Sequence, residues 1–247
     1  MSRSEFVSGG YTHVQAPLAL GALNNRWALA KAADFNSDVD VLNYALTLEY
    51  LEAEFYRQGN AAGLVSGKTR TYTRAVQQDE EAHVAAITAT IKQLGGMPVK
   101  APGVAFGNAF ASRTSFLTTA VTFENVGVGA YLGAAGFIKS KAVLSAAAGI
   151  FGVEARHAAV LANVLGLTPE GGVYKGAFET PIAKAAVLSA VAPFLTGKAP
   201  TGGVGTGVGD SGTLQTGLVT AGGVALVGAA AAGYLARKKA AGGNADS

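Results

Sequence analysis

Apolar residues recur every three or four positions in the stretch that begins after Ser37 and runs to Gly59. That period places one apolar stripe along a helix, whereas a half-buried strand would alternate every second position. The pattern predicts an amphipathic helix over residues 38–59, capped by Ser37 and ended by Gly59. Its predicted polar face carries four residues: Asn43, Thr47, Tyr50 and Glu54.

Three further long helices are predicted, over residues of about 68–94, 111–138 and 142–165. The first of these ends at Gly95-Gly96 with prolines just beyond, which is a typical helix stop. Four helices of similar length without a convincing strand predict an all-α four-helix bundle, with residues 95–110 as a crossover connection. A shorter helix is predicted over residues 181–195.

The ends of the chain differ in composition from this central region. Residues 1–36 form an N-terminal extension without the charged and apolar regions of a secretory signal. The predicted bundle, 37–166, is followed by an additional helical segment, 167–196, and by a Gly-rich flexible linker, 197–215. The last segment, 216–247, begins with an uncharged stretch long enough to span a bilayer and ends in a basic cluster.

Composition excludes several classes of protein. With 49% hydrophobic and 14% charged residues, the chain has enough apolar surface to fold. The absence of cysteine excludes disulfides, thiolate metal sites and cysteine nucleophiles. A net charge of +3 without a basic stripe gives no support to nucleic-acid binding. The Gly-rich run 202–207 has neither a preceding strand nor the Lys-Ser/Thr ending of a phosphate-binding loop, which argues against a nucleotide site.

Two of the three histidines follow a glutamate by three positions inside predicted helices: Glu80 and His83, then Glu154 and His157. Residues three apart lie on one helix face, so each pair offers a carboxylate and an imidazole to the same point. The two other long helices also carry glutamates at related positions. Glu49 precedes Glu80 by 31 residues and Glu124 precedes Glu154 by 30, so the chain consists of two similar helix pairs.

A bundle that brings these four helix midpoints together would bury four carboxylates and two imidazoles. Unpaired buried carboxylates each lose solvation worth several kcal/mol or more, so we expect cations among them. Two divalent ions would balance the four negative charges. Oxygen-dominated ligands with one imidazole per metal favour two Fe or Mn ions over structural Zn. The alternative is that the Glu–His pairs are surface ion pairs, each worth a few tenths of a kcal/mol.

The duplicated motif resembles the ligand set of the ferritin-like di-metal carboxylate superfamily. Residues 38–56 are similar, more narrowly, to the desiccation-related ferritin-like proteins of plants and bacteria. The resemblance covers residues 38 to about 165. It implies a ferritin-like four-helix bundle, here with an extra C-terminal helix and a Gly-rich tail.

The resemblance also implies roles for individual residues. Glu80 and Glu154 would bridge the two metals, and His83 and His157 would each bind one. Glu49 and Glu124 would be terminal ligands, although Glu52 lies near the centre of the same apolar face, so the choice between Glu49 and Glu52 stays open. Tyr56 and Tyr131 would orient carboxylates from across the bundle. Three further acidic residues are expected either to face solvent, which is the favoured role, or to support the ligands from outside the cluster: Glu54, Asp79 and Glu81.

The implied function is a reaction of reduced metal, O2 or peroxide at a di-iron or di-manganese centre, in protection against desiccation or oxidative stress. Ferroxidase, oxidase and peroxidase reactions all remain open. The alternative is a structural or cell-envelope-associated ferritin-like protein without turnover. The apolar C-terminal segment predicts membrane or envelope association with the bundle outside the cytoplasm. A cytoplasmic location, protein packing by this segment and a homo-oligomer are further alternatives.

Overall fold

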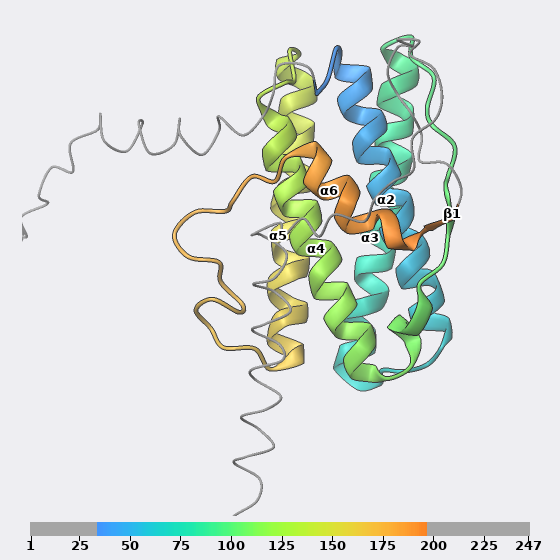
Figure 1. Cartoon of the computed structure of the whole chain (residues 1–247), viewed down its shortest axis with the longest axis vertical. Helices are drawn as coiled ribbons and strands as arrows, with labels where there is room; N and C mark the ends of the chain where they lie inside the picture. The colour runs from blue at the N-terminus through green and yellow to red at the C-terminus, as the bar shows by residue number, and fades with distance from the viewer. Residues whose placement is uncertain (1–33, 197–247) are drawn as a thin grey trace, which may run out of the picture.

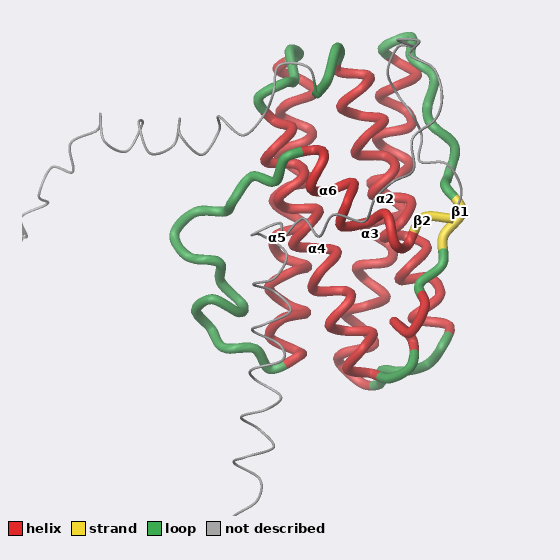
Figure 2. The backbone as a smooth tube through the Cα atoms, viewed as in Figure 1, coloured by secondary structure: helices red, strands yellow, loops and turns green. Residues whose placement is uncertain are grey.

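Four long helices make up most of residues 34–196, the part of the chain that the computed structural model describes (Figures 1 and 2). These helices confirm the predicted all-α bundle and begin and end within a few residues of the predicted positions. They are α2 (Asp38–Ala61), α3 (Gly67–Gln93), α4 (Arg113–Ala135) and α5 (Lys141–Leu165). The N-terminal extension up to residue 33, the Gly-rich linker and the apolar C-terminal segment lie outside the described residues.

The helices pack as two hairpins, because α2 lies mainly against α3 and α4 mainly against α5. Serine side chains cap three of the four N-termini. Ser37, Ser112 and Ser140 accept hydrogen bonds from backbone amides in the first turns of α2, α4 and α5. The C-terminus of α5 is followed by Gly166, whose φ of 80° is the left-handed conformation that glycine adopts readily. Local capping and apolar periodicity thus agree on where these helices begin and end.

Gly59 does not end the first helix, contrary to the sequence prediction, because α2 continues to Ala61. The glycine is buried, and the ring of Phe116 from α4 lies against its backbone, where a Cβ atom would overlap the ring. Phe116 packs in turn against Phe55, at 5.3 Å between ring centroids. Gly59 is therefore a packing residue that lets α4 approach α2 closely, rather than a helix stop.

The predicted polar face of α2 is also largely covered. Thr47 is buried, and its hydroxyl donates to the carbonyl oxygen of Asn43 one turn earlier. The Asn43 side chain fixes the long connection, since it donates to the Met97 carbonyl at 3.1 Å and accepts from the Val99 amide at 2.8 Å. Asn43 thus holds the crossover against the helix, while Thr47 is buried with its hydroxyl bonded within the helix.

A short helix crosses the bundle after α5 (Figure 1). It is α6 (Lys184–Val191), followed by a 3-10 turn η2 (Ala192–Phe194), and is shorter than the predicted 181–195. Ile182, just before it, lies against Gly129 and Gly133 of α4 and donates its amide to the Gly129 carbonyl at 2.9 Å. The chain then forms β2 (Leu195–Thr196), which pairs antiparallel with β1 (Gly103–Val104) of the long connection. A further 3-10 turn, η1 (Gly107–Phe110), leads into α4.

Among the described helices, α5 is the one whose length and mean hydropathy of 1.2 would suffice to cross a membrane. That criterion considers length and composition alone. In the bundle, α5 carries the buried Glu154 and His157 and packs along α4. We therefore treat it as a bundle helix that contributes to the site.

Candidate metal centre

The six predicted ligands converge at the centre of the bundle. Each ligand lies near the middle of one of the four long helices. The packing of the helices therefore brings the side chains together at mid-height in the bundle. All four glutamates of the set are fully buried, and His157 is buried while His83 is nearly so. The set comprises Glu49 from α2, Glu80 and His83 from α3, Glu124 from α4, and Glu154 and His157 from α5.

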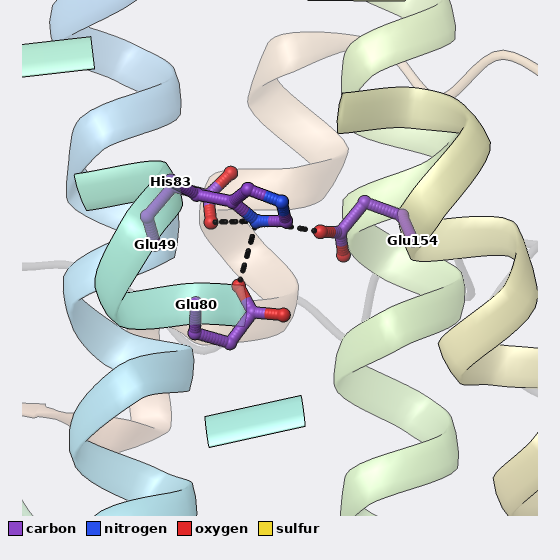
Figure 3. A group of neighbouring side chains, drawn as sticks. All are labelled: Glu49, Glu80, His83 and Glu154. Atoms are coloured by element: carbon purple, nitrogen blue, oxygen red, sulfur yellow. Dashed lines mark hydrogen bonds and ion pairs between the residues drawn. The ribbon is translucent and has the colours of Figure 1, made fainter. Parts of the chain in front are cut away.

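Four of these side chains surround one point, which we call the His83 group: Glu49, Glu80, His83 and Glu154 (Figure 3). The Nδ1 atom of His83 lies 3.2 Å from an oxygen of Glu49 and 3.3 Å from oxygens of both Glu80 and Glu154. A single N–H cannot donate well to three carboxylates at once. The arrangement instead places four ligand atoms within 4.8 Å of one another, around a space that suits a cation.

A second point is surrounded by the His157 group: Glu80, Glu124, Glu154 and His157. The Nδ1 atom of His157 lies 3.1 Å from an oxygen of Glu80 and 3.2 Å from an oxygen of Glu124. Glu80 and Glu154 belong to both groups. That shared position is where carboxylates bridging two metals would have to lie.

Several atoms of the cluster have no hydrogen-bond partner within the described residues. They are Glu80 Oε1, Glu124 Oε2, both carboxylate oxygens of Glu154 and Nδ1 of His157. A buried carboxylate oxygen without a partner costs free energy that the fold must offset. Metal ions would satisfy these orphaned atoms together. The donor set, two imidazoles and four carboxylates, fits iron or manganese.

Two tyrosines orient the terminal carboxylates. The hydroxyl of Tyr56 donates to Glu124 Oε1, and the hydroxyl of Tyr131 donates to Glu49 Oε1. Burial and the charge of the neighbouring glutamate raise the pKa of each tyrosine well above its usual value. The tyrosines therefore stay protonated as donors, and each one reaches from its own hairpin to a carboxylate of the other.

Without metal, the cluster holds protons. Burial raises the pKa of Glu80 to about 8, although contacts with His157 and His83 oppose the shift. Burial would lower the pKa of both histidines, but the close approach of the surrounding carboxylates outweighs it. The pKa rises to about 12 for His83 and to about 11 for His157. Protonated imidazoles thus supply the positive charge that divalent metals would otherwise bring.

Glu52 is buried next to the cluster but belongs to neither ligand group. Burial, followed by the charge of Glu154, raises its pKa well above the usual range. A Cβ atom at Gly127 would lie 3.3 Å from Glu52 Oε1 and 2.8 Å from Glu154 Oε2. Gly127 therefore leaves room for both carboxyl groups. Of the two candidates on α2, the geometry groups Glu49 with the other ligands.

Asp79 lies at the surface and also contacts a candidate ligand, so it combines the two roles that the sequence left open for it. Its side chain is 52% exposed, yet its Oδ2 lies 3.1 Å from Nε2 of His157. The signal that could have found it is its position directly before Glu80, which puts it on the flank of α3 that faces α5. The other two acidic residues pair with neighbours on their own helices. Glu54 pairs with Arg57 at 2.6 Å, and Glu81 accepts from Gln77 at the surface.

Comparison with known proteins agrees with this architecture. The family model of the ferritin-like domain matches residues 37–167, just over half of the chain and all four long helices. No curated protein matches the chain.

Proposed function

Because this chain belongs to the ferritin-like domain family, we propose that its buried cluster binds two iron or manganese ions that react with O2 or peroxide. The proposed role is the oxidation of reduced metal or the removal of oxidants during desiccation or oxidative stress. The observation that carries the proposal is the set of orphaned carboxylate and imidazole atoms in the two ligand groups. These atoms are buried without hydrogen bonds among the described residues, although three of the carboxylate oxygens lie 3.1–3.3 Å from an imidazole nitrogen.

Charge balance supports two ions rather than one. Once metal has displaced their protons, Glu49, Glu80, Glu124 and Glu154 together bring four negative charges into the buried centre of the bundle. Two divalent ions supply four positive charges, whereas one ion would leave two carboxylates unbalanced in a medium of low dielectric constant. Glu52 adds a fifth carboxyl group, whose pKa burial raises, so that the neutral form is favoured.

The protein's own residues determine what chemistry the site can carry. When bound, the metal pair supplies redox capacity and open coordination positions for O2 or peroxide. Tyr56 and Tyr131 hold one oxygen of Glu124 and of Glu49, which leaves the other oxygen of each carboxylate facing a ligand group. The raised pKa of Glu52 favours a neutral carboxyl group beside Glu154. Phe55 and Phe123 are buried in the core of the bundle, with ring centroids 5.0 Å apart.

Metal content and turnover test the proposal together. Protein expressed in iron- or manganese-supplemented medium should contain about two ions per chain, and it should consume Fe(II) with O2 or decompose peroxide. The Glu124→Gln variant keeps the shape of the side chain, so it should still fold. It should retain about one ion and lose at least tenfold in turnover.

Glu54→Gln, a surface change on α2, should affect neither metal content nor turnover and serves as the control. A wild-type protein that binds no iron or manganese would overturn the proposal. Two bound ions without turnover would instead support the structural alternative.

The location of the protein is proposed from the sequence. We propose that residues 216–236 associate with a membrane or envelope, since they are uncharged and are followed by Arg237-Lys238-Lys239. The bundle would then lie outside the cytoplasm, connected through the Gly-rich linker 197–215. Membership of the desiccation-related subfamily is likewise proposed, from the similarity over residues 38–56.

A further inference from the structure

The metal centre is duplicated nearly residue for residue between the two hairpins. Glu49 and Tyr56 correspond to Glu124 and Tyr131, each 75 positions later. Glu80 and His83 correspond to Glu154 and His157, each 74 positions later. The same shift relates Asp79, which precedes Glu80, to Val153, which precedes Glu154. At this position an acidic residue in one hairpin corresponds to an apolar residue in the other.

This difference affects the two histidines unequally. In His157 the inner nitrogen Nδ1 faces Glu80 and Glu124, and the outer nitrogen Nε2 lies within hydrogen-bond distance of Asp79, at 3.1 Å. The outer nitrogen of His83 lacks such a partner. The Nδ1 atom of His83 faces three carboxylates, and its Nε2 has no hydrogen-bond partner within residues 34–196. Val153, which corresponds to Asp79, has no side-chain acceptor to offer.

A carboxylate that accepts a hydrogen bond from the outer nitrogen of a metal-binding histidine has known physical effects. It fixes the tautomer that leaves the inner nitrogen free to bind metal, it restricts rotation of the ring, and it makes the imidazole a stronger donor. Removing such a partner typically weakens metal binding by about 10- to 100-fold. The Asp79 contact should therefore matter for metal affinity even though half of this side chain is exposed.

We propose that Asp79 is a positioning residue that makes the two metal positions unequal. The His157 group binds its ion first and more tightly, while the His83 group binds second and exchanges its ion more readily. This inference rests on the proposed two-metal function and adds to it an order of loading. One ion would be resident, and the other position would be the one where incoming Fe(II) arrives as a substrate.

A titration with Co(II) tests the order, with calorimetry measuring each step and visible absorbance reporting the ligands. Metal-free wild-type protein should show two binding steps whose dissociation constants differ by about 10- to 100-fold. Glu124→Gln should remove the tight step, and Glu49→Gln should remove the weak one. These two isosteric variants identify which group gives which step.

Variants of Asp79 then test its role. Asp79→Ala should weaken the tight step by about 10- to 100-fold, so that the two steps merge. Asp79→Asn keeps an acceptor oxygen without the charge and should give an intermediate loss. Glu81→Ala removes the same charge from the same helix two residues away, at an exposed position, and should change neither step.

Several results would overturn the inference while leaving the two-metal proposal intact. They are two equal steps in the wild type, an unchanged tight step in Asp79→Ala, or loss of the tight step in Glu49→Gln. Absence of Co(II), iron and manganese binding in the wild type would overturn the proposed function itself.

Discussion

Without metal, the protein should become less stable as the pH rises from about 5 to 8. Burial raises the pKa of Glu80 in the folded chain to about 8, from 4.5 when it is exposed. A group whose pKa is higher in the folded state stabilises the fold fully below its unfolded pKa. That contribution is lost as the pH rises through the folded pKa. At 1.36 kcal/mol per pKa unit, the shift of Glu80 corresponds to a loss of roughly 5 kcal/mol in the free energy of unfolding across this pH range. That is a large share of a typical domain's stability.

The two histidines also make the metal-free protein less stable as the pH rises. Their carboxylate neighbours raise the pKa of His83 to about 12 and that of His157 to about 11, against 6.5 for an exposed imidazole. Above pH 6.5 the unfolded chain releases these protons while the folded chain keeps them, so unfolding is favoured further as the pH rises. Bound metal reverses the dependence, because it requires deprotonated ligands and displaces the protons. The stabilisation by metal should therefore grow with pH.

Urea unfolding followed by circular dichroism measures this effect. Chelator-treated protein at pH 5, 6, 7 and 8 should show a midpoint that falls steadily, and Mn(II) should raise the midpoint most at pH 8. Glu80→Gln cannot ionise, so it should flatten the part of the dependence that comes from this residue. A metal-free midpoint that is constant or rises between pH 5 and 8 would refute the assignment of the buried protons.

Three other predictions concern packing, carboxylate orientation and location. Gly59→Ala should destabilise the protein by roughly 1–3 kcal/mol in urea unfolding, because the new methyl group overlaps an aromatic ring. At an exposed helix position the same change would stabilise the protein by about 1 kcal/mol. The sign of the change in unfolding free energy therefore distinguishes a packing role for Gly59 from an exposed position. Tyr56→Phe should leave folding intact and lower metal affinity, measured by chelator competition, by about 10- to 100-fold, since Glu124 loses its donor. Truncation after Thr196 should release the bundle from the membrane fraction of expressing cells, and full-length protein that is wholly soluble would contradict the anchor.

The helices and the ligands could be predicted because both follow from local spacing. A 3.6-residue period sets where α2 to α5 run, and residues three apart share a face whatever the rest of the fold does. Glu80 and His83 therefore point to the same place in any bundle. Two such pairs in one chain were enough to predict a common centre.

Features that depend on neighbouring helices could not be predicted in this way. Gly59 looks like a stop along the sequence, and only the ring of Phe116 explains it as a contact. Asn43 looks solvent-exposed on a helical wheel, yet its side chain bonds to the connection after α3. Asp79 looks like a surface charge because its partner His157 is 78 positions away. In each case the deciding contact comes from a segment distant in sequence.

The crossed tyrosines mean that neither hairpin can build a working half of the centre by itself. Tyr56 belongs to the first hairpin and holds Glu124 of the second, and Tyr131 does the reverse for Glu49. If the chain were cut in the connection after α3, each fragment would carry a carboxylate with no hydroxyl to orient it. The ligands would be complete only after the fragments recombined in the right register. Metal occupancy is thus a readout of correct assembly, since the ions can be held only once the two halves of the chain have met.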